Sequence, residues 1–359
     1  MATTPHDPLK TMLPQRLEAQ WIDAFAHTFA LCGLKSGDTA AILSETLSRP
    51  VNVQLAELAL LRLGVQAFHI VLPTPLPNAP VPVRSTGASD AIRSLAPVIK
   101  ALAATTFVAD ITVEGLLHAP ELPQILAGGT RVLMISNEPP EVLVRCLPDA
   151  ALEPKVKAGM KRLRVARQMR VESAAGSNLT IALAGAVVGG GWGYTARAGT
   201  ISHWPGGLCL AFPAAGSVNG VLVMNEGDVN LTFKRYLAKP VTLTIENDYV
   251  VDIAGAGLDA DLMRSYFAAW GDRNAYAVSH VGFGLNPHAR WDSMAFYDKA
   301  DFNGTELRAF AGNFLYSTGA NEVAKRHTLG HFDLPLKDCT VALDGDIVVD
   351  AGRLCSDLA

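Results

Sequence analysis

The sequence predicts an N-terminal α/β domain with a mostly parallel sheet, followed by a β-rich α+β domain. Three observations lead to this fold class. Strand-like and helix-like segments alternate through the first 150 or so residues, which is typical of a parallel sheet covered by helices. Beyond them the chain changes to short strands separated by glycine-rich turns. The length of 359 residues also exceeds what one core usually organises.

The first part opens with an expected helix over Leu17–Leu31, where Trp21, Phe25 and Phe29 recur at helical spacing. A strand at Thr39–Leu43 follows the turn after it. The same rhythm then continues through a helix and three further strands, expected at Ser48–Leu63, Ala67–Leu72, Thr105–Val113 and Arg131–Ser136.

A basic segment at Leu152–Arg170 predicts a solvated or interdomain helix. We place the domain boundary here, with an N-terminal domain at 1–165 and a C-terminal domain at 166–359. Two helices, Leu258–Trp270 and Glu306–Tyr316, are expected within the second domain.

Composition excludes several classes of protein. Hydrophobic residues make up 49% of the chain and the net charge is -4, which indicates a folded protein without the basic surface that nucleic acids require. Five scattered cysteines predict reduced thiols and a cytoplasmic location, and Met1–Gln15 has no apolar core of a signal peptide. No apolar stretch is long enough for a membrane span, and no phosphate-binding glycine motif occurs. We expect a small-molecule substrate and a homo-oligomer.

The most informative motif is His331-Phe332-Asp333. On a strand, residues two apart point to the same face, so this imidazole and this carboxylate could bind one metal ion together. The alternative is an ordinary edge strand with a surface His and Asp.

Other histidines add candidates. His280 opens a glycine-rich turn, and His118 follows an expected strand, at the edge where ligands of α/β sheets gather. His69 lies inside an apolar strand and is interpreted as a core residue. Two imidazoles and one carboxylate form the facial triad of non-haem Fe(II) oxygenases, whereas a two-zinc hydrolase needs several carboxylates. Asp333 is the only acid inside these motifs.

From about Val171 onward the chain resembles the M29 class of thermophilic metallo-aminopeptidases. The resemblance is more diffuse in the first half, at Gly33–Asp38. In the second half it rests on four segments in the family's order, namely Gly176–Thr180, Pro205-Gly206-Gly207 with Phe212-Pro213, Gly216–Gly220 and His331-Phe332-Asp333.

The departures from that family change the expected function. Leu208 and His280 stand where the aminopeptidases carry metal-binding Glu residues, and no His lies near Ala309 or Phe310, where they carry a ligand. This pattern is similar to the 2,5-dihydroxypyridine 5,6-dioxygenase branch of the same fold. The resemblance implies that His280, His331 and Asp333 bind Fe(II). It also implies an extradiol-like ring opening, in which O2 converts the pyridine to N-formylmaleamate in aerobic nicotinate breakdown.

The same resemblance places His203 and His118 in the second sphere, where either could be the catalytic base. Trp204, Tyr316 and Ser317 are expected at the substrate, although the aromatic residues could equally be core. Two alternatives stay open at this point: an M29-like metal-dependent aminopeptidase or hydrolase, and a binding protein without metal.

Overall fold

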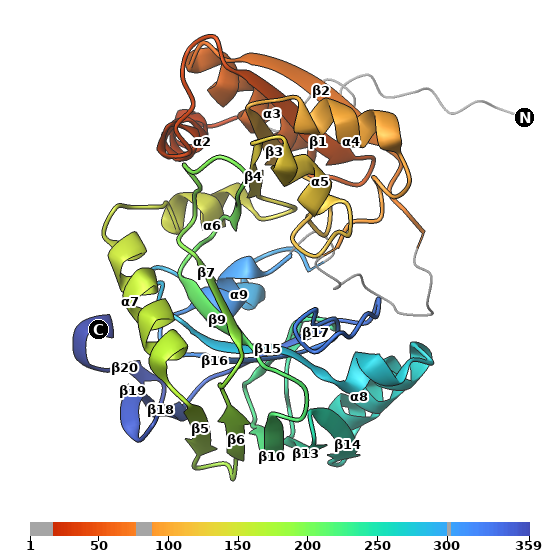
Figure 1. Ribbon diagram of the computed structural model, residues 1–359, viewed down its shortest axis with the longest axis vertical. Coiled ribbons are helices and arrows are strands. Elements are labelled where there is room, and N and C mark those ends of the chain that lie inside the picture. Colours follow the sequence, from red (N-terminus) through yellow and green to blue (C-terminus); the bar gives the residue numbers. More distant parts are fainter. Residues whose placement is uncertain (1–16, 77–87, 300–302) are drawn as a thin grey trace, which may run out of the picture.

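The N-terminal part is built on a sheet whose strands are all parallel, as predicted. The computed structural model describes residues 17–76, 88–299 and 303–359, so Met1–Gln15 lies outside the described residues. We call this five-stranded sheet the parallel sheet (Figure 1). Its strands, in spatial order, are β2 (Gln66–Leu72), β1 (Thr39–Glu45), β3 (Phe107–Asp110), β4 (Arg131–Met134) and β8 (Ile201–His203).

Helices cover both faces of the parallel sheet. Successive side chains of a strand point to opposite faces, and accordingly Ile42 and Leu43 of β1 belong to two different hydrophobic clusters. One cluster includes Phe25 and Phe29, and the other includes Leu102. The helices around the parallel sheet are α2 (Ala19–Leu31), α3 (Pro50–Arg62), α4 (Ala96–Ala103), α5 (Leu122–Ala127) and α6 (Pro140–Arg145). The next helix, α7 (Leu152–Val165), packs instead into the hydrophobic core of the C-terminal part.

The C-terminal part consists mainly of two antiparallel sheets. The long sheet has the order β14 (Tyr249–Ala254), β13 (Val241–Glu246), β10 (Val218–Met224), β6 (Asn178–Ala182), β5 (Gln168–Ser173), β18 (Cys339–Leu343), β19 (Asp346–Asp350) and β20 (Arg353–Leu354). The other antiparallel sheet, which we call the site sheet, has the order β17 (Phe332–Leu336), β16 (Phe314–Thr318), β15 (Val278–Gly284), β9 (Leu208–Phe212) and β7 (Val187–Gly191). Smaller elements are β11 (Val229–Asn230), β12 (Arg235–Tyr236), α8 (Leu258–Ala269), α9 (Thr305–Ala309), η1 (Arg273–Tyr276), η2 (Ser293–Ala295) and η3 (Ser356–Leu358).

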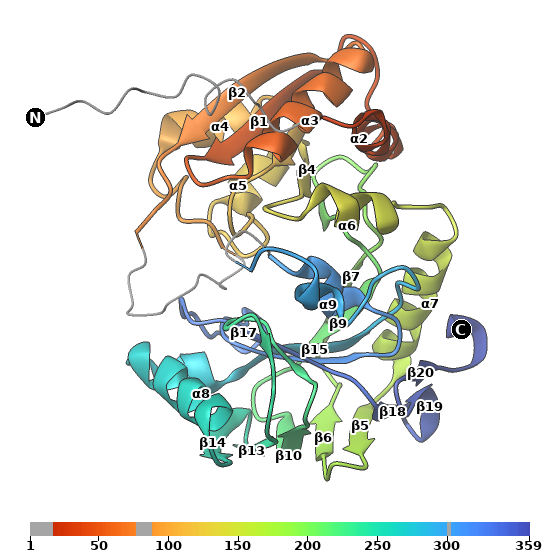
Figure 2. The same cartoon turned by 180° about the vertical axis from the view of Figure 1, so that it is seen from behind.

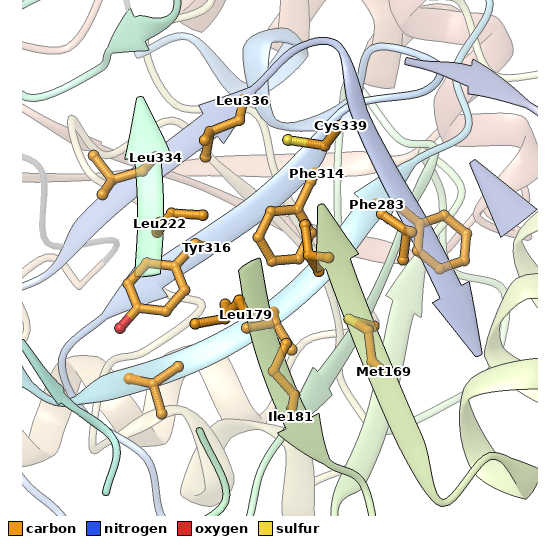
Figure 3. Close-up of a cluster of buried hydrophobic side chains, with 14 of the residues drawn as sticks. Met169, Leu179, Ile181, Leu222, Phe283, Phe314, Tyr316, Leu334, Leu336 and Cys339 are labelled. Atoms are coloured by element: carbon orange, nitrogen blue, oxygen red, sulfur yellow. The ribbon is translucent and has the colours of Figure 1, made fainter. Parts of the chain in front are cut away.

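A large hydrophobic core lies between the long sheet and the site sheet. Figure 3 shows Leu179 and Ile181 of the long sheet beside Phe314 and Tyr316 of the site sheet. One face of the site sheet is therefore fully occupied by core packing. Its opposite face is turned toward the N-terminal part, with α9 between them (Figure 2).

The strand β8 complicates the division of the chain after residue 165. It lies in the C-terminal half of the sequence but pairs with β4 of the parallel sheet. Five residues after its last residue, His203, the chain enters β9 of the site sheet at Leu208. We retain domains at 1–165 and 166–359 as a proposal, with β8 crossing between them.

Several expected elements differ from the structure. The helix expected over Glu306–Tyr316 ends at Ala309, and β16 begins at Phe314. Gly312 separates them with φ of +85°, and a Cβ there would lie 1.9 Å from the backbone oxygen of Gly352. A helix cannot continue through that conformation.

Two further expectations were wrong. The basic helix ends at Val165 instead of Arg170, because Met169 and Val171 alternate inward in β5. His69 is exposed on the edge strand β2, near Glu57, and is not a core residue. Among the described residues, no helix has the length and apolarity to cross a bilayer.

Candidate metal site

Three neighbouring strands of the site sheet bring a row of polar side chains together. His280 of β15 is paired with Ser317 of β16, and Ser317 is paired with Asp333 of β17. Residues opposite one another in adjacent strands share a face. His331 precedes Asp333 by two residues and lies beside it, as the His-x-Asp spacing predicts.

The donor atoms of His280, His331 and Asp333 all lie within 4.8 Å of one another. Nε2 of His280 is 3.6 Å and Nε2 of His331 is 3.3 Å from Oδ1 of Asp333. All three side chains are buried. Two imidazole nitrogens and one carboxylate oxygen converging on one point fit a single transition-metal ion with open coordination positions.

The charge states suit metal binding. Burial lowers the pKa of His280 to about 3, so this imidazole is neutral and has a free lone pair at neutral pH. Burial opposes ionisation of Asp333, but His331 and Arg308 outweigh it and hold the pKa of Asp333 well below its usual value. Asp333 and His280 are therefore already in the protonation states that bind a metal ion.

The Asp333 carboxylate is held from two sides. Nε of Arg308 donates to Oδ2 at 2.5 Å, and the Ser317 hydroxyl donates to Oδ1. Charge-assisted hydrogen bonds of this kind fix the orientation of a ligand. Sequence reasoning did not single out Arg308. The available signal was the resemblance, which places an aminopeptidase ligand one or two residues further on, at Ala309 or Phe310.

Two buried carboxylates hold the helix that carries Arg308. The backbone N–H of Thr305, the first residue of α9, donates to Oε1 of Glu138 at 2.6 Å. Glu306 forms an ion pair with Arg145 at 2.6 Å. Both glutamates are fully buried, so α9 is tied to the N-terminal part on one side and reaches Asp333 on the other.

His118 reaches the site from the parallel sheet. Its ring centroid lies 5.1 Å from that of His331 and 6.1 Å from that of His280. It follows β3, as expected for a group at the carboxyl end of a strand. Burial lowers the pKa of His118 to about 3, so the imidazole is neutral at physiological pH.

His203 ends β8 and is buried. Its Nδ1 lies 2.6 Å from the carbonyl oxygen of Pro205. A carbonyl only accepts hydrogen bonds, so Nδ1 carries the proton and Nε2 is left as an acceptor. Burial, opposed by the bond to Pro205 and supported by the charge of Arg308, lowers the pKa of His203. His203 is thus close enough to Arg308 to sense its charge.

The structure separates the expected substrate-binding residues. Ser317 lies on the face of the site sheet that carries His280 and Asp333. Tyr316, its neighbour on β16, points to the other face and is fully buried in the core (Figure 3). Trp204 packs edge-on against Phe25 in the N-terminal core, and its indole N–H donates to the carbonyl of Cys146. We therefore withdraw Tyr316 and Trp204 as substrate contacts.

An aromatic residue that was not predicted at the site does lie there. The ring centroid of Phe212 on β9 is 5.3 Å from that of His280. Phe283 and Phe314, by contrast, belong to the core between the two antiparallel sheets.

Known proteins resemble this chain over most of its length. The family model described as 2,5-dihydroxypyridine 5,6-dioxygenase matches residues 20–356. A curated protein of that name from Pseudomonas putida KT2440 is 37% identical over 339 residues, covering 93% of this chain and 95% of that protein.

Solved structures extend the comparison. The 2,5-dihydroxypyridine dioxygenase of Pseudomonas putida KT2440 superposes with a TM-score of 0.89 at 35% identity, covering 95% of this chain and 99% of the other. Wild-type AmpT from Thermus thermophilus superposes with a TM-score of 0.59 at 14% identity, covering 94% of this chain and 99% of the other. The second likeness shows a shared fold alone.

Proposed function

The chain belongs to the 2,5-dihydroxypyridine 5,6-dioxygenase family, and from this membership we propose that it opens the ring of 2,5-dihydroxypyridine with O2. Both atoms of O2 enter the product, N-formylmaleamate, as the bond between the hydroxyl-bearing carbon and the carbon beside nitrogen breaks. The substrate is a small molecule, and the reaction belongs to aerobic nicotinate breakdown. The observation that carries the proposal within this chain is the convergence of two histidines and one aspartate on one buried point.

The metal cofactor would be held by His280, His331 and Asp333, and we propose Fe(II) as the ion. When bound, Fe(II) supplies the one-electron chemistry that O2 needs to react with a closed-shell ring. The donor set supports this choice because nitrogen and carboxylate ligands that leave positions open are those of non-haem iron oxygenases. Arg308 and Ser317 keep the Asp333 carboxylate in place through their hydrogen bonds.

The proton of the substrate hydroxyl must be accepted before the ring is electron-rich enough to be oxidised. We propose His203 as the first candidate for this base, because its Nε2 is unprotonated and its Nδ1 is held by Pro205. His118 is the second candidate, since its ring is neutral and lies beside both proposed histidine ligands. Ser317 stays a proposed neighbour of the substrate because it shares the metal-site face.

Oxygen uptake tests the proposed function. Protein loaded anaerobically with Fe(II) should consume one O2 per molecule of 2,5-dihydroxypyridine, with N-formylmaleamate as product. A matched control substrate is 2-hydroxypyridine, which lacks the second hydroxyl and should give no uptake. Full iron occupancy without any O2 consumption would contradict the proposal.

The wider cellular setting stays a prediction. The cytoplasmic location is a prediction that rests on cysteine usage. The homo-oligomer is a prediction from the sequence alone, to be tested by light scattering of the purified protein.

A further inference from the structure

His118 is carried by a turn and not by a strand or helix. The backbone N–H of Ala119 donates to the carbonyl of Leu116 at 2.9 Å, which closes a turn with His118 at its third position. A catalytic side chain on a turn needs something else to fix it, because a misplacement of about 1 Å can cost on the order of 100-fold in rate.

One buried carboxylate organises the segment leading to this turn. Oδ1 of Asp110, the last residue of β3, accepts hydrogen bonds from the N–H and the hydroxyl of Thr112, at 3.1 and 2.6 Å. Oδ2 accepts the N–H of Leu116 at 2.7 Å. The Thr112 hydroxyl in turn accepts the N–H of Gly115 at 3.1 Å. Asp110 and Thr112 are both fully buried.

Asp110 is itself fixed to the parallel sheet. Its carbonyl oxygen accepts the backbone N–H groups of Ile135 and Ser136, which follow β4, at 2.8 and 3.1 Å. The segment also packs closely on that strand, since a Cβ at Gly115 would lie 2.0 Å from Sδ of Met134. Hydrogen bonds through Asp110 therefore connect the sheet to Leu116, where the turn bearing His118 begins.

We propose that Asp110 is a positioning residue for His118: its carboxylate fixes the turn that places the His118 ring beside His280 and His331. This inference rests on the proposed function, because Asp110 can affect turnover through this turn only if His118 acts in the reaction. The carboxylate is needed for its two acceptor oxygens, both of which face donors. An asparagine would turn an N–H2 group toward one of those donors and lose that bond.

The Asp110→Asn variant should keep its metal content and lose at least about ten-fold in kcat, with KM little changed, because a positioned base is displaced while the metal site is intact. Thr112→Val should give a smaller loss in the same direction. Thr130→Val is the matched control. Thr130 is also fully buried, and its hydroxyl donates to carbonyls that include Thr105 O at 2.8 Å, at the opposite end of the sheet. It should lower stability as Thr112→Val does and leave kcat unchanged.

A double-mutant cycle separates positioning from mere structural support. In a His118→Ala background, Asp110→Asn should lower the residual kcat by less than about two-fold, because residues that act as a unit are not additive. A full additional ten-fold loss in that background would overturn the proposal. So would a normal kcat in Asp110→Asn when His118→Ala itself has lost activity.

Histidine-ring NMR provides a readout that does not depend on turnover. The ring signals of His118, assigned by their loss in His118→Ala, should shift in Asp110→Asn and Thr112→Val but not in Thr130→Val. If His118→Ala keeps full activity, the proposed role of His118 fails, and the NMR shifts still decide whether Asp110 positions the ring. Unshifted His118 signals in Asp110→Asn would refute the positioning itself.

Discussion

At the residue scale, the charges around the metal site favour an anionic substrate. If His280, His331 and Asp333 hold a divalent ion as proposed, one carboxylate and two neutral imidazoles leave that ion with a net positive charge. Arg308 adds another, and it is only 15% exposed at its side chain. A buried excess of positive charge is costly unless an anion approaches it. A dihydroxypyridine that has lost its hydroxyl proton meets that need, which explains why a neutral base is placed close by.

Replacing His331 by alanine should remove metal and turnover together, because one of the three proposed donors is lost. Metal analysis by mass spectrometry and oxygen uptake would be measured on the same preparation. His327→Ala is the matched control, since His327 is exposed and four residues away, and it should retain both. Full iron occupancy in His331→Ala would take His331 out of the ligand set.

The stability of the protein should fall as the pH drops below about 6.5, partly because of His118. Its pKa in the folded state is lowered to about 3, so the unfolded chain binds a proton near pH 6.5 that the folded chain does not bind. The stability from this residue is fully present above pH 6.5 and is lost as the pH falls toward 3. At pH 5 the loss is about 1–2 kcal/mol.

Urea denaturation at pH 7.5 and pH 5.0 measures this effect. The His118→Ala protein should lose about 1–2 kcal/mol less than the wild type between the two pH values. His288→Ala, at an exposed position, should follow the wild type. Parallel pH profiles for His118→Ala and the wild type would show that His118 is not buried in its neutral form.

At the element scale, β7 shapes the surroundings of His203. A Cβ added at Gly191 would lie 2.9 Å from Nε2 of His203, which is too close for the ring to stay in place. A Cβ at Gly189 on the same strand would meet only a ring carbon of Phe212, at 3.9 Å. The two glycines differ by one strand repeat, yet only one of them makes room for the proposed base.

Gly191→Ala should therefore keep its metal and lose roughly 100-fold in kcat, as a displaced base does. Gly189→Ala should stay within about two-fold of the wild type. Steady-state oxygen uptake with metal analysis distinguishes the two variants. Equal activity of both variants would show that His203 does not need its present position for turnover.

The sequence predicted those elements whose side-chain periodicity reflects burial. The His-x-Asp spacing correctly placed His331 and Asp333 on one face, and the alternation of strands and helices correctly predicted the parallel sheet. The apolar pattern was misleading at Phe314–Tyr316. The apolar residues there follow those of α9 closely, so the sequence predicted one helix across the break at Gly312. Short apolar runs do not distinguish a buried strand from a helix.

Contacts between residues that are far apart in the sequence determine the parts of the site that the local sequence pattern does not predict. Arg308 meets Asp333 across 25 positions of sequence, and no spacing rule links them. Tyr316 and Ser317 are neighbours on β16, so only the registration with β17 decides which of them faces the site. The closeness of His118 to His280 likewise depends on how the parallel sheet sits over the site sheet.

At the scale of the whole molecule, the fold is shared with AmpT of Thermus thermophilus. Leu208 is a buried aliphatic residue where the sequence resemblance to the M29 aminopeptidases places a metal-binding Glu. The wild-type protein should therefore not hydrolyse leucyl amides with Zn²⁺, Co²⁺ or Mn²⁺, because one carboxylate cannot balance two dications. A chromogenic leucyl-amide assay checks this. Turnover at the rate of an aminopeptidase would contradict the dioxygenase assignment.

The path of the chain from β8 into β9 has a consequence for heat denaturation. His203 is the final residue of the parallel sheet's edge strand, and the site sheet begins at Leu208. Because this connection is short, we expect that disordering one sheet displaces the adjoining strand of the other. Calorimetry should accordingly record one endotherm, with a van't Hoff enthalpy equal to the calorimetric enthalpy. Two resolved peaks would mean that β8 can detach from β4 without disturbing β9.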